Sequence, residues 1–377
     1  MEFGFTEEQE MLRTLARDFL TKECPKSKVR ALDKDEKGYD PQIWRSMAEL
    51  GWMGLVFPEE YGGINAGFMD LVVLMEEMGR NILPGPFFST IGLCALPLLE
   101  YGTSQQKETL LPQIARGEAI WTLALTELSG SYRASEIRLP VSLRGDEYVL
   151  EGEKFFVSDA HVADYMLVVG RTGNGMSSEE GITIFIVGAK DHAVRMEMIP
   201  TIGGDRQFRV SFNELGAGKG DILGEVGQGW CIVDFILQRA AVLKCAEISG
   251  ACQAVLEMTS AYAKERVQFD RPIGSFQAVQ HKLADMLIDV EGVQYLVYQA
   301  AWGISIGSPS RLQISAAKAK ASEVYQRVCI DGITAHGAIG YTMDHDMGLY
   351  YRRVRAAHFV AGDVDLHKER IAVELGL

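Results

Sequence analysis

The fold is decided by the segment Arg266-Val267-Gln268-Phe269-Asp270-Arg271-Pro272-Ile273-Gly274-Ser275-Phe276-Gln277, where one long helical pattern ends and another begins. The stretch from Trp230 to Phe269 contains no proline and has helical periodicity throughout. Pro272 breaks this pattern, because proline removes a helical hydrogen bond. Further helices are expected from Ser275 to about Ile306 and from about Arg311 to His336. Helices of this length favour a bundle.

The first part of the chain, to about residue 122, is also predicted to be helical. Thr6 followed by Gln9 forms a capping-box pattern before a run of apolar residues at helical spacing. A second helix is expected from about Met69 to Met78. Prolines and glycines mark the loops on both sides of it.

The region from about 123 to 225 is predicted to be a β domain. Its strand-like runs are Tyr148–Leu150, Tyr165–Val169, Ile182–Val187, Arg195–Ile199 and Arg209–Phe212. No helical pattern lies between them to carry parallel crossovers, so an antiparallel arrangement is expected. The order is therefore α, β, α, an α+β class. We expect a helical domain at 1–122, a β domain at 123–228 and a helical bundle at 229–377.

Charge and composition exclude several functions. The chain has 377 residues and a formal net charge of −14, which disfavours nucleic-acid binding. Its six cysteines include no C-x-x-C pair, so neither a zinc site nor a thioredoxin motif is expected. The segment Asp344-His345-Asp346 is interpreted as a solvated loop, and no metal is expected. The acidic start and the lack of a membrane-length apolar run predict a cytoplasmic protein without a membrane span.

Common catalytic motifs are missing. No G-x-G-x-x-G follows a strand, which makes a nicotinamide Rossmann site improbable. No G-x-S-x-G or H-E-x-x-H is present. The glycine-rich stretch 224–230 is interpreted as a connection between domains, and Cys245 and Cys252 as buried thiols on one helix face.

Four separate segments are informative as a set, although none of them is specific alone. They are 123–131 (LALTELSGS), 152–164 (GEKFFVSDAHVAD), 266–286 (RVQFDRPIGSFQAVQHKLADM) and 336–342 (HGAIGYT). In order and spacing they resemble the acyl-CoA dehydrogenase family, and the resemblance covers nearly the whole chain. It implies a helical N-terminal domain, a middle antiparallel β-barrel domain and a C-terminal four-helix bundle, which agrees with the three zones.

The resemblance also implies an FAD site. Contacts to the flavin ring are expected from five positions: Leu125, Thr126, Ser131, Phe156 and Ser158. Hydroxyl and N–H groups can bond the polar edge of the ring while Phe156 covers a face. Arg266, Phe269 and Gln277 are expected to reach the FAD of a neighbouring subunit, and an arginine suits the pyrophosphate. Gly337 and Ala338 match an element that approaches the cofactor closely; the family pattern there is Gly-Gly, so Ala338 departs from it.

By the same resemblance, the residue that usually acts as the catalytic base is missing. In the family, a glutamate removes the α-proton of the acyl-CoA while the β-hydrogen leaves as a hydride to the flavin. The matching stretch is Phe359-Val360-Ala361-Gly362-Asp363, which puts Ala361 at the base position. Some members carry the glutamate on the first long C-terminal helix, but Leu237–Ala241 offers no carboxylate either.

Three explanations stay open. The chain is a partner subunit in a heterotetramer, similar to the small subunit of pimeloyl-CoA dehydrogenase, a resemblance carried by 362–370 and 245–247. Alternatively, a homomeric enzyme uses another carboxylate, with Glu247 and Asp363 as candidates. Thirdly, the fold serves other flavin chemistry or binding. The resemblance implies an acyl-CoA substrate, a tetramer and an electron-transferring flavoprotein as acceptor. Small residues at Gly92, Ala95, Ala240 and Ala241 hint at space for a bulky acyl group.

Overall fold

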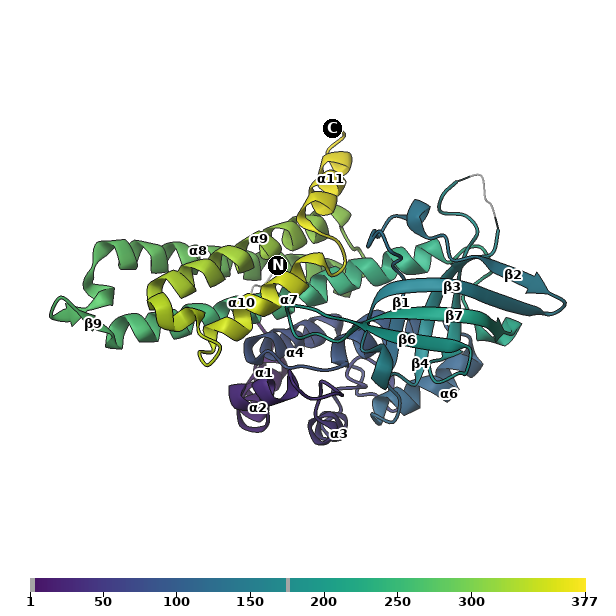
Figure 1. The fold of residues 1–377 in the computed structure, drawn as a ribbon, viewed down its shortest axis with the longest axis horizontal. Helices are drawn as coiled ribbons and strands as arrows, with labels where there is room; N and C mark the ends of the chain where they lie inside the picture. Colours follow the sequence, from purple (N-terminus) through teal and green to yellow (C-terminus); the bar gives the residue numbers. More distant parts are fainter. Residues whose placement is uncertain (1–3, 174–176) are drawn as a thin grey trace.

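The computed structural model describes residues 4–173 and 177–377, so the first three residues of the acidic start lie outside it. A β domain lies at one end of a long helical bundle, and the N-terminal helices pack along one side of both (Figure 1). Those N-terminal elements are α1 (Glu7–Glu23), α2 (Lys26–Leu32), α3 (Pro41–Glu49), α4 (Phe68–Asn81), the π-helix η2 (Phe88–Ala95), α5 (Leu96–Tyr101) and α6 (Ser104–Ala115). The predicted capping box is confirmed, since the side chains of Thr6 and Gln9 each accept the other's backbone N–H.

The middle domain consists of two four-stranded sheets. One has the order β1 (Trp121–Ala124), β4 (Tyr165–Arg171), β5 (Ile182–Gly188), β8 (Ile222–Leu223). The other has the order β2 (Val141–Arg144), β3 (Glu147–Ser158), β7 (Gln207–Ala217), β6 (Val194–Ile199). The expected antiparallel pattern is wrong for one pair, because β1 and β4 run parallel with Trp121 opposite Tyr165. Strands β2 and β3 of the second sheet lie between them in the chain and provide the crossover that no helix supplies.

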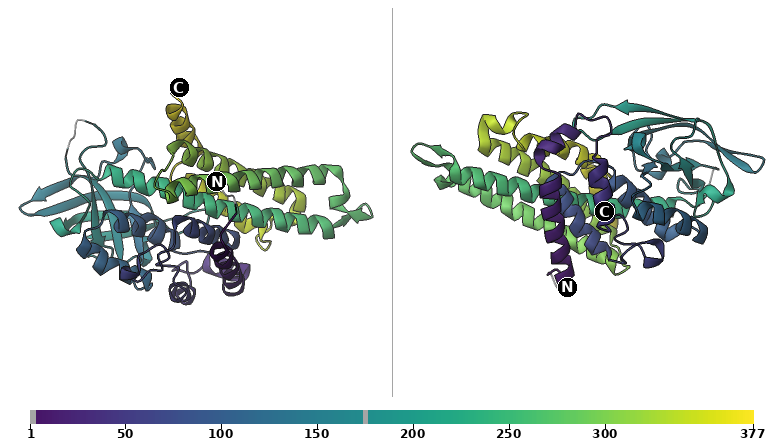
Figure 2. Two further views of the ribbon diagram at one scale, coloured as in Figure 1. Left: turned by 180° about the vertical axis from the view of Figure 1, so that it is seen from behind. Right: turned by 90° about the horizontal axis from the view of Figure 1, so that it is seen from below.

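Five helices follow the β domain: α7 (Trp230–Glu265), α8 (Gln277–Ser305), α9 (Arg311–His336), α10 (Met347–Phe359) and α11 (Val364–Glu374). The first of them ends at Glu265 rather than at Phe269, so that prediction was four residues too long. A hairpin of β9 (Val267–Gln268) and β10 (Arg271–Pro272) replaces the last turn, because Phe269 and Asp270 adopt left-handed backbones that no α-helix contains. Helix α11 projects away from the bundle (Figures 1 and 2).

Two glycines let the N-terminal domain approach the bundle closely. A Cβ atom added at Gly79 of α4 would lie 1.9 Å from the Glu247 carbonyl oxygen, and one at Gly250 of α7 would lie 1.8 Å from that of Glu76. Helices α4 and α7 therefore touch backbone to backbone, which is possible only where no side chain intervenes. No helix within the described ranges has the length and hydropathy needed to cross a membrane.

Candidate functional site

Five predicted positions lie together where β1 ends beside β3, and we call them the proximal cluster: Leu125, Thr126, Ser131, Phe156 and Ser158. The Thr126 hydroxyl donates to the Phe155 carbonyl at 2.7 Å, and the Phe155 N–H donates to the Thr126 carbonyl at 2.9 Å. A Cβ atom at Gly130 would lie 3.6 Å from the Phe156 ring, so the loop folds back over this strand. The structure thus brings residues about thirty positions apart into one place.

A buried ion pair lies against the proximal cluster and stabilises it. The fully buried Lys154 ammonium donates to the Leu125 carbonyl at 2.9 Å and to Glu127 at 2.8 Å. Burial lowers the pKa of Lys154 to about 8, although Glu127 opposes the shift. For Glu127, burial alone would raise the pKa, but Lys154 and two backbone N–H groups outweigh it and lower the pKa. Both groups are therefore charged at neutral pH, and they hold the loop in one conformation.

The strand that carries Phe156 and Ser158 is irregular. Its pairing with β7 shifts between Lys154 and Val157, a β-bulge that turns the intervening side chains outward. Phe156 has a left-handed backbone with φ of 58°, and its side chain is 45% exposed. Ser158 is half-buried, and its carbonyl accepts the hydroxyl of Thr122 at 2.5 Å. An open aromatic face beside a hydroxyl fits a planar polar ring.

The other five predicted positions gather at the opposite end of the bundle, and we call them the distal cluster: Arg266, Phe269, Gln277, Gly337 and Ala338. The rings of Tyr262 and His336 stack at 4.4 Å and join the ends of α7 and α9 there. Phe269 is 86% exposed in the turn of the β9–β10 hairpin, and this hairpin lies at the end of the bundle away from the β domain (Figure 1). A Cβ atom at Gly337 would meet nothing within 4 Å, which leaves room for a ligand. One chain cannot bring the two clusters together, so a shared site requires a second chain.

Ala361, at the expected base position, lies on a tightly held turn between α10 and α11. Its backbone is left-handed with φ of 59°, and it is only 2% exposed. Its carbonyl oxygen lies 3.1 Å from Nε2 of the buried His367, and its N–H contacts the hydroxyl of Tyr132. The buried ammonium of Lys318 donates to the carbonyls of His358 and Gly362, each at 3.0 Å. Tyr132 directly follows Ser131, so this turn abuts the proximal cluster.

Both proposed substitute bases are engaged in local contacts. Asp363 is the N-cap of α11, and its Oδ1 accepts the N–H of Leu366 at 2.8 Å. Glu247 pairs with the Lys244 ammonium at 2.5 Å on α7. Each carboxylate already serves a local structural purpose.

A carboxyl group that the sequence analysis did not single out lies beside Ser158. Asp159 is half-buried with a left-handed backbone, and its Oδ2 accepts the Ser89 hydroxyl of η2 at 2.7 Å. Burial raises the pKa of Asp159 to about 6, against weaker opposing effects of the Ser89 hydrogen bond, Arg353 and Lys244. This hydrogen bond joins the N-terminal domain to the β domain directly behind the proximal cluster.

Space for a bulky acyl group is not evident at the small residues. A Cβ atom at Gly92 would lie 3.1 Å from Leu243 and 3.4 Å from the Phe88 ring. Gly92 therefore permits close packing of η2 against α7. Ala95, Ala240 and Ala241 are buried as well, with exposed fractions of 1% or less. The packing speaks against the bulky-acyl hypothesis.

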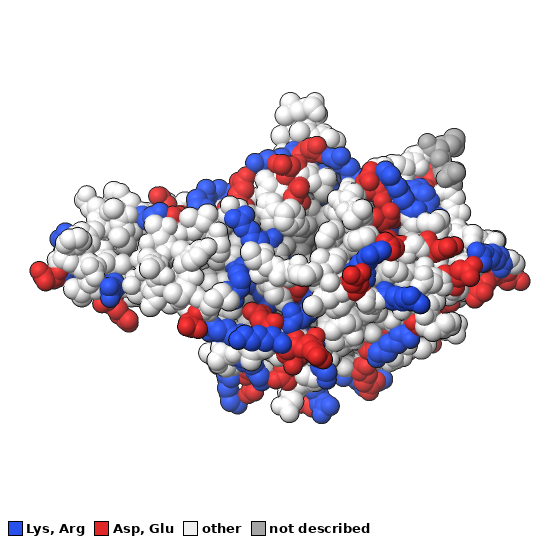
Figure 3. Space-filling model, in the orientation of Figure 1, with Lys and Arg blue, Asp and Glu red and all other residues white. Residues whose placement is uncertain are grey.

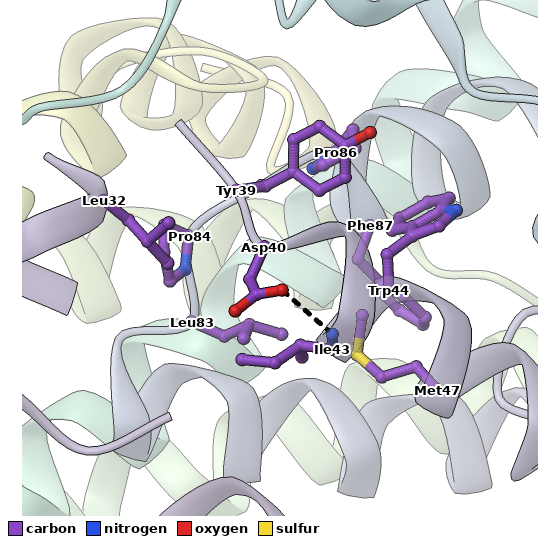
Figure 4. A pocket seen from close by; sticks show the side chains of 11 residues that line it. Leu32, Tyr39, Asp40, Ile43, Trp44, Met47, Leu83, Pro84, Pro86 and Phe87 are labelled. Atoms are coloured by element: carbon purple, nitrogen blue, oxygen red, sulfur yellow. Dashed lines mark hydrogen bonds between the residues drawn. The ribbon is translucent and has the colours of Figure 1, made fainter. Parts of the chain in front are cut away.

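Two hollows lie elsewhere. A pocket between α3 and the loop before η2 has about 10 Å³, room for about one water molecule, with Tyr39 and Trp44 in its wall (Figure 4). A groove of about 580 Å³ runs between α7 and α8 from Leu256 to Leu287, near the distal cluster.

On the face in Figure 3, acidic and basic side chains are interspersed over the β domain. In the described part of the chain, no three potential metal ligands gather, and Cys245 and Cys252 are buried thiols.

Four positions that matter here share backbone strain: Phe156, Asp159, Phe269 and Ala361 have left-handed backbones. Such conformations cost free energy in non-glycine residues and cluster at functional sites. Sequence reasoning did not find Tyr132, Asp159 or Lys318, because neither a buried lysine nor a left-handed aspartate has a linear signature.

Comparison with known proteins agrees with this geometry. Three domain models match: "Acyl-CoA dehydrogenase, N-terminal domain" over residues 6–118, the middle domain over 122–215 and the C-terminal domain over 227–376. The chain is 33% identical to 3-(aryl)acrylate reductase of Clostridium sporogenes, over 98% of this chain and 99% of that protein.

Solved structures show the same architecture over the whole chain. Butyryl-CoA dehydrogenase from Megasphaera elsdenii superposes with a TM-score of 0.93 and 27% identity, covering 100% of both chains. A chain of the ChsE4–ChsE5 complex from Mycobacterium tuberculosis superposes with a TM-score of 0.91 and 28% identity, covering 100% of this chain and 99% of that one.

Proposed function

The chain belongs to the acyl-CoA dehydrogenase family of flavin-dependent oxidoreductases, and we propose that it acts on the Cα–Cβ bond of an acyl-CoA as the subunit without the catalytic glutamate. The observation that carries this proposal is the turn at Ala361. Lys318 and His367 hold this turn by buried hydrogen bonds, and the turn carries a methyl group where the family resemblance places a carboxylate.

The residues present fit FAD. Phe156 offers an open ring face beside the hydroxyls of Thr126 and Ser158, which suits the flavin ring. At the other end of the bundle, Arg266 is an exposed cation and the backbone at Gly337 is open, which suits a pyrophosphate. When bound, the flavin supplies the acceptor for the β-hydrogen as hydride. The two clusters lie at opposite ends of the helical bundle, so each FAD would be held by two subunits.

Removal of the α-proton needs a proton acceptor, because an α-C–H bond is weakly acidic even beside a thioester. Ala361 and Ala240 offer none, and Glu247 and Asp363 are engaged in an ion pair and a helix cap. A related subunit that carries the glutamate would complete the reaction. The ChsE4–ChsE5 complex, to which this chain is similar, joins two proteins in one assembly and supports this arrangement.

An electron-transferring flavoprotein is the electron acceptor that we propose for the complex. The chain is similar, at a TM-score of 0.92 and 29% identity, to a structure described as an electron-transferring flavoprotein of Acidaminococcus fermentans. A self-sufficient homomer with a displaced base is the alternative, and the carboxyl group of Asp159, near the proximal cluster, would favour it.

Co-expression tests the proposal. The chain would be produced with a glutamate-bearing homologue from the same genome, and the purified product would be analysed by native mass spectrometry. A mixed tetramer that contains FAD is expected. Stable homotetramers of this chain, with one FAD per subunit and turnover of acyl-CoA, would contradict the assignment as a partner subunit.

A further inference from the structure

Two segments of the distal cluster are joined by a pair of stacked rings. The ring of His336, the last residue of α9, lies on that of Tyr262 near the end of α7, with centroids 4.4 Å apart and planes at 25°. The Tyr262 carbonyl accepts the N–H of Arg266 at 2.8 Å. Gly337 directly follows His336 in the chain. The stacked pair therefore links the segment of the cation to the segment of the open backbone.

The His336 ring is fixed within its own helix. It is 5% exposed, and its Nδ1 lies 2.8 Å from the carbonyl oxygen of Gly332, one turn earlier. A carbonyl oxygen only accepts, so Nδ1 carries the hydrogen and Nε2 of the neutral ring carries none. Within the described ranges, Nε2 is buried and has no hydrogen-bond partner. A second proton on this ring would therefore have no acceptor in the chain.

The surroundings of His336 favour its neutral form. Burial lowers the pKa of His336, the hydrogen bond to Gly332 opposes this shift, and His345 lowers the pKa further. The His345 ring makes an edge contact with that of His336, with centroids 4.8 Å apart. The loop that carries His345 is held by Arg30 of α2, which donates to the Asp344 carbonyl at 2.7 Å. An imidazolium at His336 would thus be buried beside a second histidine, which is costly.

The backbone that follows His336 folds back against it. Gly337 has φ of 71° and ψ of −148°, a region essentially limited to glycine. A Cβ atom at Gly340 would lie 2.8 Å from the Cβ of His336, so η7 (Gly337–Tyr341) packs directly on this residue. A change in the position of the His336 ring would therefore move the backbone at Gly337.

We propose that His336 is a positioning residue for FAD: its ring, stacked on Tyr262, sets the place of the Gly337 backbone relative to Arg266 so that both contact one pyrophosphate. This inference rests on the proposed function and adds to it a residue outside the two clusters. His336 brings no charge to the cofactor. The arginine supplies the charge, and the stacked ring supplies the geometry.

A competing interpretation makes His336 a charged ligand of the pyrophosphate. In that case the bound diphosphate would favour a proton on Nε2, and FAD would bind more tightly as pH falls. The stacked neutral ring predicts otherwise. A phenylalanine at this position, which stacks but cannot be protonated, should give the same dependence of FAD affinity on pH as the wild type.

Fluorescence titrations of the complex with a glutamate-bearing homologue, freed of flavin, test the inference. The two probes are FAD and riboflavin, which lacks the pyrophosphate. His336→Ala removes the ring and should weaken FAD binding by about tenfold while riboflavin binding stays unchanged. His336→Phe keeps the ring, so its FAD affinity should stay within about twofold of the wild type from pH 6 to pH 8. Tyr262→Leu removes the other ring and should resemble His336→Ala.

Three results would overturn the inference alone: wild-type FAD affinity in His336→Ala, an equal loss of FAD and riboflavin affinity in that variant, or FAD binding that strengthens at pH 6 in the wild type and not in His336→Phe. The third comparison keeps the ring in both proteins, so it stays decisive if His336→Ala fails to fold. A wild-type complex that binds neither flavin would instead refute the proposed function together with this inference.

Discussion

The ammonium nitrogen of Lys318 lies 3.0 Å from the carbonyl oxygen of Gly362, and none of its four hydrogen-bond acceptors is a carboxylate. A buried charge that is bonded only by neutral groups is expensive. The cost is tolerated here because the lysine closes the end of α10 and fixes the turn at Ala361. The turn at Ala361, the expected base position, is thus held in place by a buried lysine.

Replacement of Lys318 by methionine should loosen this turn. The carbonyls of His358 and Gly362 would lose their donor, at a cost of about 1–3 kcal/mol for each unsatisfied group. Hydrogen exchange followed by mass spectrometry should show at least about tenfold faster exchange in residues 357–363. The control is Lys320→Met on the same helix, whose ammonium is near Asp289 at 3.6 Å. Equal exchange in the two variants would contradict this role.

The same lysine predicts a pH dependence of stability. Burial lowers the pKa of Lys318 to about 8, from 10.5 for the ordinary side chain. Between these two values the unfolded chain binds more protons, so unfolding free energy should rise with pH. From pH 7.5 to 9.5 the rise attributable to Lys318 is on the order of 2 kcal/mol. Urea unfolding at both pH values should show this rise in the wild type relative to Lys318→Met; equal responses of the two proteins would contradict it.

Ionisation of Asp159 should give the opposite dependence on pH: the free energy of unfolding should fall as pH rises in the acid range. Burial raises its pKa from 3.8 to about 6, so the folded chain binds more protons between these values. Stability is therefore lost as pH rises through this window. Asp159→Asn should be more stable than wild type at pH 7.5, by about 1 kcal/mol after allowance for its partial exposure. Thermal unfolding at pH 7.5 and pH 4 checks this, and a difference that persists at pH 4 would rule the charge out as its cause.

The buried pair beneath the proximal cluster should matter for folding and for FAD. Lys154→Met leaves Glu127 without its cation, and breaking a buried pair costs about 3–5 kcal/mol. The double variant Lys154→Met/Glu127→Leu should recover much of this loss, because no unpaired charge is left. Urea unfolding measures both effects. A single variant as stable as wild type would show that the pair does not support the loop.

Arg266 should affect FAD and leave the fold intact. It is exposed at the end of α7, so Arg266→Ala should not change the unfolding temperature. Loss of a charge-assisted bond to the pyrophosphate should weaken FAD binding by about 10- to 100-fold. Fluorescence titration of the apo-complex with FAD measures this, with Lys264→Ala as the exposed neighbouring control. The same affinity in both variants would place the pyrophosphate elsewhere.

Local patterns predicted most of the fold. Long proline-free periodicity marked α7 and α9, and turn residues separated the strands. Tertiary contacts set the rest. The parallel pairing of Trp121 with Tyr165 depends on a crossover through the second sheet, and the early end of α7 depends on left-handed Phe269 and Asp270. Neither the parallel pairing nor the early end of α7 leaves a periodic pattern in the sequence.

The predicted site residues form two groups that the linear order does not reveal. Thr126 and Phe156 meet because Lys154 ties their loop and strand together. Tyr132, whose hydroxyl contacts the backbone N–H of Ala361, could not be found from spacing, because only the tertiary fold brings its loop to the turn that carries Ala361.

The measurement that tests the central claim most directly is the visible spectrum before and after addition of acyl-CoA thioesters. It would be recorded for this chain alone and for its complex with a glutamate-bearing homologue. We predict that flavin bleaches in the complex, and that the chain alone is colourless or keeps its flavin absorbance with every thioester tested. Bleaching in the chain alone would contradict the account, because a proton acceptor would then have to lie within this chain.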